Sequence, residues 1–202
     1  MRPAFQQLLL RRLHEKADQP VFTVVHRTGS KPTTDLTGAM MLDRVVHMQT
    51  VWREVCGQEP TTVVLAFLHG ELFLTSLIAG LLSDVTVVPV ALPRLGADSD
   101  RLRHIVQDCG ATAVFCNAEQ TENLYRALTL GDEADLPCPV AGLDADGTVT
   151  MVKKGAAHRP TAVPGDTFGP TLIQYTSGST RLPKGVRIFA EQIMTNAELS
   201  RD

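Results

Sequence analysis

The chain has 202 residues, of which 44% are hydrophobic and 20% charged, and its formal net charge is -3. This balance is typical of a soluble globular chain with a sizeable core, and without a basic stripe it argues against a nucleic-acid-binding protein. No apolar run reaches the roughly 18 residues of a membrane span, and the first residues lack the features of a secretory signal. We therefore expect a cytoplasmic protein without a membrane span.

Hydrophobic periodicity predicts a short strand and two helices in the first quarter of the chain. Residues 3–16 have apolar positions at helical spacing, residues 21–25 resemble a strand, and residues 35–57 form a second helical stretch after a polar turn. The apolar residues on or near one face of this second stretch are Leu42, Val45, Val46, Met48, Val51 and Val55. We expect that face to pack on a sheet.

The middle of the chain alternates between strand and helix patterns. Residues 62–68 are a nearly continuous apolar run, which is typical of a strand buried on both faces. Further segments are a helix at 72–82, a strand at 85–90, a helix at 101–109 and a strand at 113–116. Such alternation predicts an α/β fold, with a mostly parallel sheet flanked by helices and joined by right-handed crossovers.

Residues 129–167 lose this periodicity and gather Asp, Gly and Pro, so we predict an exposed connection. Basic residues lie near its end: Lys153, Lys154, His158 and Arg159. A role in attracting nucleotide or a carrier protein is one interpretation, but a solvated surface is the simpler one. For His69, His104 and Trp52 we predict structural rather than catalytic roles, because none has a neighbouring partner in the sequence.

Four cysteines are scattered along the chain without a short paired spacing. They are Cys56, Cys109, Cys116 and Cys138. This distribution predicts neither a zinc site nor a disulfide framework. We expect reduced thiols that are mostly buried.

The most informative segment is residues 174–186, QYTSGSTRLPKGV, which follows an apolar, strand-like lead. Its hydroxyl groups come from Thr176, Ser177, Ser179 and Thr180. Gly178 allows a ligand to approach the backbone closely, and Lys184 supplies a positive charge for phosphate oxygens. The segment therefore predicts a phosphate-binding loop, and a nucleoside triphosphate is the expected ligand.

The commoner phosphate loop does not fit this segment. That loop has a second glycine five residues after the first, then a lysine and a Ser or Thr. Counting from Gly178, the second glycine position holds Pro183, and Gly185 follows Lys184. The mismatch argues against a Walker-type ATPase.

The segment instead resembles the signature loop of the AMP-forming ligases, which include acyl-CoA synthetases, fatty acyl-AMP ligases and peptide-synthetase adenylation domains. From Tyr175 to Val186 only Arg181 departs from the general pattern, which has glycine there. One interpretation is that Arg181 strains the loop and weakens ATP binding. The other, which we favour, is that Ser-Thr-Arg preceded by Gln174 and Tyr175 marks the fatty acyl-AMP ligase branch.

Two further features resemble the amino-terminal part of these ligases. One is a strand that ends in prolines, here Pro89 and Pro93, and the other is a following helix with paired basic residues, Arg101 and Arg103. The resemblance implies that ATP and Mg²⁺ are cofactors and that a fatty acid is activated as acyl-AMP with release of pyrophosphate. The residues it assigns to nucleotide binding are Thr176, Ser177, Gly178, Ser179, Thr180, Lys184 and Gly185.

The family's full proteins are more than twice as long as this chain. The resemblance therefore implies that residues 1–202 are a partial amino-terminal, ATP- and acyl-binding domain, and that the rest of the large domain and the carboxy-terminal domain are absent. Catalytic residues and metal ligands would lie downstream, so we expect an inactive isolated chain that self-associates through exposed apolar surface. An acyl carrier protein or CoA would accept the acyl group.

A non-catalytic relic or interaction module that keeps the ligase fold is the alternative. Phe189 and Ala190 stand where the resemblance leads one to expect Ser and His. These two positions, together with Arg181, would permit a loss of chemistry.

Overall fold

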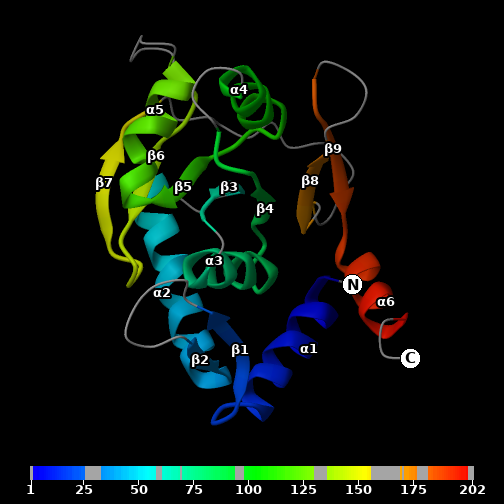
Figure 1. Ribbon diagram of the computed structural model, residues 1–202. Coiled ribbons are helices and arrows are strands. Elements are labelled where there is room, and N and C mark those ends of the chain that lie inside the picture. The colour runs from blue at the N-terminus through cyan, green and yellow to red at the C-terminus, as the bar shows by residue number, and fades with distance from the viewer. Residues whose placement is uncertain are drawn as a thin grey trace.

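The computed structural model describes residues 2–25, 33–57, 61–68, 70–93, 98–129, 136–155, 169, 171–176 and 182–199. The first elements are α1 (Arg2–Glu15), β1 (Pro20–Val25), β2 (Thr33–Thr37), α2 (Gly38–Cys56), β3 (Thr62–Ala66), α3 (Glu71–Leu81), β4 (Thr86–Pro89) and α4 (Ser99–Asp108). They are followed by β5 (Ala113–Asn117), the 3₁₀ turn η1 (Ala118–Gln120), α5 (Thr121–Thr129), β6 (Val140–Leu143), β7 (Val149–Lys153), β8 (Leu172–Thr176), β9 (Lys184–Ile188) and α6 (Ala190–Leu199). Figure 1 shows their arrangement.

The larger of the two sheets formed by the described residues has the strand order β7-β6-β5-β3-β4-β8-β9. Strands β3, β4, β5, β6 and β8 run parallel to their neighbours within this group, whereas β7 and β9 are antiparallel edge strands. Helices connect the central parallel strands, as crossover connections require. The predicted α/β fold with a mostly parallel sheet is therefore confirmed.

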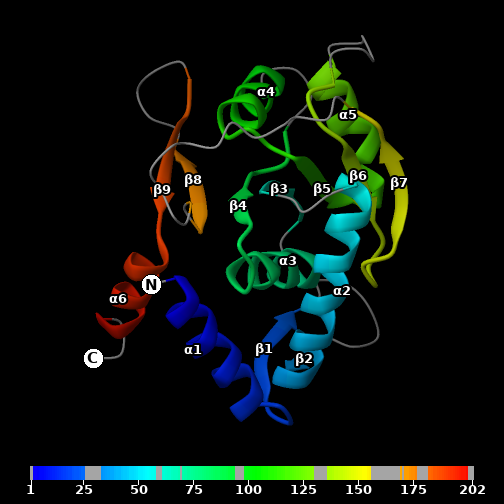
Figure 2. The ribbon, with the colours of Figure 1, turned by 180° about the vertical axis from the view of Figure 1, so that it is seen from behind.

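Helices cover both faces of this sheet. Val63 and Leu65 of β3 face the core that contains α2 and α3, while Val64 and Ala66 face the core that contains α4 and α5. Because successive side chains of a strand point to opposite faces, a continuous apolar run satisfies both layers. Figures 1 and 2 show α4 above β3 and β4, and α3 below them.

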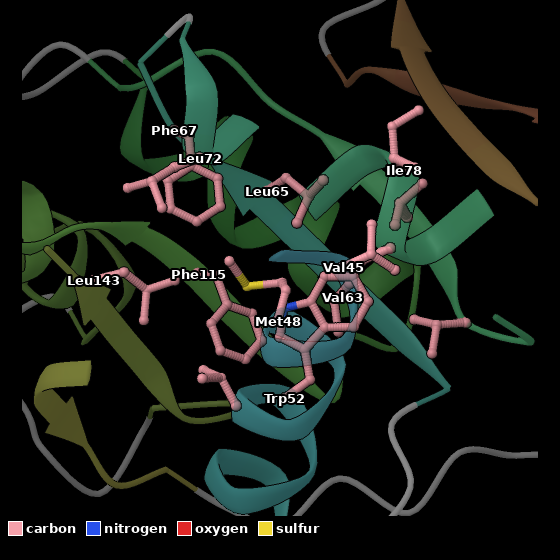
Figure 3. Close-up of a cluster of buried hydrophobic side chains, with 14 of the residues drawn as sticks. Val45, Met48, Trp52, Val63, Leu65, Phe67, Leu72, Ile78, Phe115 and Leu143 are labelled. Atoms are coloured by element: carbon pink, nitrogen blue, oxygen red, sulfur yellow. The ribbon is translucent and has the colours of Figure 1, made fainter. Parts of the chain in front are cut away.

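The core on the α2 side is centred on Trp52, which is completely buried. Figure 3 shows Met48 and Trp52 of α2 lying against Phe115 of β5 and Val63 of β3. The ring centroids of Trp52 and Phe115 are 5.9 Å apart at an interplanar angle of 37°, within the range of favourable aromatic pairs. The prediction that Trp52 is a packing residue is confirmed.

The predicted helix at 35–57 begins later than expected. Thr33–Thr37 forms strand β2, which pairs with β1 in a separate antiparallel sheet. Thr23 of β1 pairs with Asp35 of β2, and the Thr23 hydroxyl donates a hydrogen bond to the Asp35 carboxylate at 2.6 Å. Thr37 then caps α2, since its hydroxyl accepts a hydrogen bond from the backbone N–H of Met40 at 3.3 Å. The β-branched threonines favour the strand and the cap, which the helical pattern did not reveal.

One apolar residue of α2 lies away from the core. Val46 is 61% exposed, whereas Val45 next to it is 3% exposed. Consecutive residues of a helix point about 100° apart, so both cannot face the same sheet. The expectation that Val46 lies on or near the buried face was therefore wrong.

The prediction of an exposed connection at 129–167 was wrong where the chain forms strands β6 and β7, although β7 is largely exposed as predicted. Strand β6 is entirely buried and pairs with β5, and β7 pairs with β6 at the sheet edge. Before β6, Leu136 and Cys138 are also buried. A four-residue strand that contains glycine is too short to show a periodic pattern, and only its pairing with β5 defines it. His158 and Arg159 lie outside the described residues.

Lys153 has specific partners rather than a freely solvated surface position. Its ammonium group lies 3.1 Å from a carboxylate oxygen of Glu122 and 4.8 Å from the ring centroid of Tyr125. The neighbouring Lys154 is exposed, as predicted. Lys153 therefore joins the edge strand β7 to helix α5.

All four cysteines are free thiols, of which Cys116 and Cys138 are buried and Cys56 and Cys109 are half-buried. Burial raises the pKa of the Cys56 and Cys116 thiols to about 11 and that of Cys109 to about 12. A thiol with a raised pKa stays protonated and unreactive at neutral pH.

Within the described residues, no helix combines the length and the apolar character needed to cross a membrane.

Candidate functional site

The predicted phosphate-binding loop joins the antiparallel strands β8 and β9. Thr176, the last residue of β8, pairs directly with Lys184, the first residue of β9. Directly paired residues of antiparallel strands place their side chains on the same face, so the side chains of Thr176 and Lys184 extend from the same face of the hairpin. Both residues are exposed.

The structure brings together the two ends of the predicted site. Thr176, Lys184 and Gly185 lie at the loop end of the β8–β9 hairpin. The remaining predicted nucleotide-binding residues, Ser177, Gly178, Ser179 and Thr180, lie outside the described residues, as does Arg181.

This hairpin places the candidate site at a particular edge of the sheet. Strand β8 runs parallel to β4, so the Thr176 end of β8 and the Pro89 end of β4 lie at the same edge. The carboxyl ends of β3 and β5 lie there too. In open α/β sheets ligands bind beyond the carboxyl ends of the parallel strands, so the position is suitable for a ligand.

Gly185 is needed for the packing of this hairpin. A Cβ atom at Gly185 would lie 2.9 Å from Cγ2 of Ile173 and 3.0 Å from Cζ of Tyr175. The absence of a side chain therefore lets the Tyr175 ring lie across β9 at its pairing partner Gly185. The sequence motif assigned Gly185 to nucleotide binding, and the structure gives it a local packing reason as well.

Two side chains of α4 bind the two ends of the loop. The hydroxyl of Tyr175 donates a hydrogen bond to Oδ2 of Asp108 at 2.6 Å, and Nε2 of His104 lies 3.2 Å from the carbonyl oxygen of Pro183. A carbonyl only accepts, so Nε2 of His104 carries the proton in this contact. The structural role predicted for His104 is confirmed, whereas its partner could not be predicted.

Burial, followed by the hydrogen bond to Asp108, raises the pKa of Tyr175 above its ordinary value. The phenol therefore remains a proton donor at neutral and moderately alkaline pH.

The paired basic residues of α4 differ in their surroundings. Arg103 donates to the backbone carbonyl oxygens of Ala127 and Leu128 at 3.1 and 3.2 Å, and so caps the carboxyl end of α5. Arg101 is exposed and lines a hollow of about 210 Å³ beside the hairpin. Pro89, Pro93 and Tyr175 also line this hollow.

Helix α6 begins at Ala190, and Phe189 immediately precedes it. The backbone N–H of Phe189 donates to Oε1 of Gln192 at 2.8 Å, and the Phe189 ring centroid lies 5.7 Å from the guanidinium carbon of Arg187. Ala190 is 2% exposed. In the described part of the chain these two residues therefore stabilise the start of the helix.

No group of three or more His, Cys, Asp or Glu side chains among the described residues could hold a metal ion.

A family model described as AMP-binding enzyme matches residues 12–201 of the chain. Among curated proteins, a putative fatty-acid–CoA ligase, fadD25, from Mycobacterium tuberculosis is 26% identical over 165 residues, which are 81% of this chain and 27% of that protein. The long-chain-fatty-acid–AMP ligase FadD26 from the same species is 25% identical over 198 residues, which are 96% of this chain and 32% of that protein.

A solved structure supports the same architecture. The chain superposes on a fatty acyl-adenylate ligase from L. pneumophila, crystallised with acyl adenylate and pyrophosphate, with a TM-score of 0.62 and 20% identity. The match covers 96% of this chain and 31% of that one. This likeness shows the fold, and the chain spans about a third or less of the length of these relatives.

Proposed function

Because the chain belongs to the family of AMP-binding enzymes, we propose that it is the amino-terminal part of an ATP-dependent ligase that activates a fatty acid as acyl-AMP. The observation that carries this proposal is the pairing of Thr176 with Lys184 at the loop end of the β8–β9 hairpin. This pairing places a residue with a hydroxyl donor and a residue with an ammonium group on the same face, at the carboxyl ends of the parallel strands, where ligands bind in such sheets. Residues 1–202 form a partial ATP- and acyl-binding domain in this proposal.

In the proposed reaction, a carboxylate oxygen of the fatty acid attacks the α-phosphorus of ATP. A new oxygen–phosphorus bond forms, the bond between the α-phosphorus and the bridging oxygen breaks, and pyrophosphate leaves. Lys184 and the Thr176 hydroxyl stabilise the negative charge of the phosphates, which grows on the departing pyrophosphate. Ser177, Ser179 and Thr180 complete the donor set and Gly178 shapes the loop by the family resemblance.

The fatty acid is proposed from the relatives rather than from a pocket. Two of the curated relatives, fadD25 and FadD26, are named as fatty-acid–CoA and long-chain-fatty-acid–AMP ligases. Mg²⁺ accompanies ATP in the proposal, and we assign it no step because the described residues contain no ligand cluster for it. CoA or an acyl carrier protein would then accept the acyl group.

The test uses the natural protein, recovered from its source cells with an antibody raised against residues 1–202. It is incubated with ATP, Mg²⁺, labelled pyrophosphate and a long-chain fatty acid. Formation of labelled ATP that depends on the fatty acid supports acyl-adenylate formation, because the adenylation step is then running in reverse. Absence of this exchange contradicts the proposal, and a mass of 21.9 kDa would then favour the non-catalytic interaction module.

The role of Lys184 is tested in the same assay with Lys184→Ala. Loss of a charge-assisted contact to a phosphate weakens binding by about ten- to a hundredfold, and the exchange rate at limiting ATP should fall accordingly. Lys154→Ala is the matched control. Lys154 is an exposed lysine that follows β7, the edge strand at the opposite end of the sheet from β9. Equal rates for the two variants would remove Lys184 from the site.

A further inference from the structure

We propose that His104 and Asp108 of α4 are positioning residues. They bind the residues at the two ends of the loop between β8 and β9, and thereby set the affinity of this loop for a nucleoside triphosphate. The inference rests on the proposed function for its ligand. Neither residue belongs to the loop motif, and the contacts join parts of the chain that are far apart in sequence: 67 residues separate Asp108 from Tyr175, and 79 separate His104 from Pro183.

The two side chains act from one face of the helix. Residues four apart in an α-helix lie above one another, so His104 and Asp108 point in the same direction, toward the hairpin. Asp108 accepts the Tyr175 hydroxyl at 2.6 Å, and His104 donates to the Pro183 carbonyl at 3.2 Å. One helix therefore binds β8 near its carboxyl end and the residue just before β9 at the same time.

The positions that are held are next to the positions that would bind phosphate. Tyr175 immediately precedes Thr176, and Pro183 immediately precedes Lys184. Fixing these neighbours fixes the backbone from which the hydroxyl and ammonium groups extend. Donors held in place before the ligand arrives bind it more tightly, because less conformational freedom is lost on binding.

Helix α4 is itself firmly held, as a positioning element must be. Leu102, Ile105 and Val106 are buried in the core between α4 and the sheet. Arg103 ties the helix to the carboxyl end of α5 through the carbonyl oxygens of Ala127 and Leu128. Among the described residues, β8 has one registered pair with β4, Val87 with Leu172, and Leu172 and Ile173 pack against the two cores. The contacts from α4 add to these at the loop end of the hairpin.

The Tyr175 phenol keeps its proton at neutral pH, because burial and the bond to Asp108 raise its pKa above the ordinary value. The hydroxyl that Asp108 accepts is therefore present as a donor under physiological conditions.

The experiment compares five substitutions in the natural protein that carries residues 1–202. His104→Ala and Asp108→Ala remove the contacts, while His104→Gln and Asp108→Asn each retain a donor or acceptor at similar reach. Gln107→Ala is the control, because Gln107 is exposed on the same helix between the two residues. Circular dichroism establishes that each variant is folded.

Two readouts are made on each variant. Calorimetric titration with ATP and Mg²⁺ gives the dissociation constant, and hydrogen exchange read by mass spectrometry gives the protection of amides at 172–176 and 182–188. Each alanine substitution should raise the ATP dissociation constant about three- to tenfold, the effect of one lost hydrogen bond, and should speed amide exchange in the hairpin. His104→Gln and Asp108→Asn should restore most of both properties, and Gln107→Ala should change neither.

The two readouts separate this inference from the proposed function. If the unsubstituted protein binds no ATP, the proposed function fails, and the inference fails with respect to its ligand even if hairpin exchange changes. If it binds ATP and the alanine variants bind equally well, only the positioning role is overturned. Unchanged hairpin exchange in both alanine variants also overturns it, because the contacts then hold nothing.

Discussion

Replacing Phe115 with alanine tests whether the core between α2 and the sheet stabilises the fold as the packing indicates. The Phe115 side chain is completely buried on β5 and lies against Trp52, with ring centroids 5.9 Å apart. Truncating a fully buried phenylalanine to alanine costs about 3–5 kcal/mol, which includes the lost transfer free energy and the cavity that is left. Loss of the aromatic pair places the expected value toward the upper part of that range.

The assay is urea unfolding followed by tryptophan fluorescence. Trp52 is the chain's one tryptophan, and its indole ring lies in the core beside the substitution. With a denaturant dependence of about 2 kcal/mol per molar urea, a loss of 3–5 kcal/mol lowers the unfolding midpoint by about 1.5–2.5 M. Phe115→Leu leaves part of the side-chain volume and should lower the midpoint by less.

Val46→Ala is the matched control on the opposing helix, because Val46 is 61% exposed and its truncation leaves no cavity. Its effect should stay within about 0.5 kcal/mol. The reasoning is refuted if Phe115→Ala lowers the midpoint no more than Val46→Ala does. That result would mean that the Trp52 cluster contributes little to the free energy of unfolding.

Three further predictions concern helix contacts and ionisation. Gly38→Ala should cost about 1–3 kcal/mol by thermal unfolding, because a Cβ atom there collides with the backbone carbonyl oxygen of Leu13 in α1; an unchanged melting temperature would mean that α1 does not pack there. Arg103→Ala should cost about 1–2 kcal/mol by urea unfolding, with Arg103→Lys intermediate, because the carbonyls at the end of α5 lose their donors; equal stability of Arg103→Ala and the parent would contradict this. The free energy of unfolding should fall as pH rises from about 9, because the pKa values of Cys109 and Tyr175 are raised in the folded chain. The unfolded chain then releases protons that the folded chain keeps. Urea unfolding at pH 8 and pH 10 measures this, and equal free energies would show that these groups ionise alike in both states.

Local patterns in the sequence were sufficient for the central part of the fold. The apolar run at 62–68 and the alternating segments after it predicted β3, α3, β4, α4 and β5 in the right order. Trp52 was correctly predicted to be a packing residue. These predictions succeeded because burial on both faces of a parallel sheet leaves a continuous apolar pattern in each strand.

Other elements have no such pattern. Strand β6 has four residues and contains Gly142, and β2 contains Asp35 among threonines. Each is defined by its partner strand: β5 for β6, and β1 for β2. Pairing between strands depends on positions that are distant in the sequence, so a local pattern could not reveal it.

For the candidate site too, the sequence predicted one part and the tertiary structure showed another. The sequence by itself indicated the family and predicted a phosphate-binding role for the loop, because such a loop needs hydroxyl groups, a glycine and a lysine within a few residues of one another. Only the tertiary structure decided that Thr176 lies opposite Lys184. It also decided that His104 and Asp108 bind the two ends of the loop. The residues proposed to bind phosphate lie close together in the sequence, so a motif can predict them. The residues that hold the two ends of the loop lie on a helix about 70 residues earlier, and only folding brings them within hydrogen-bonding distance.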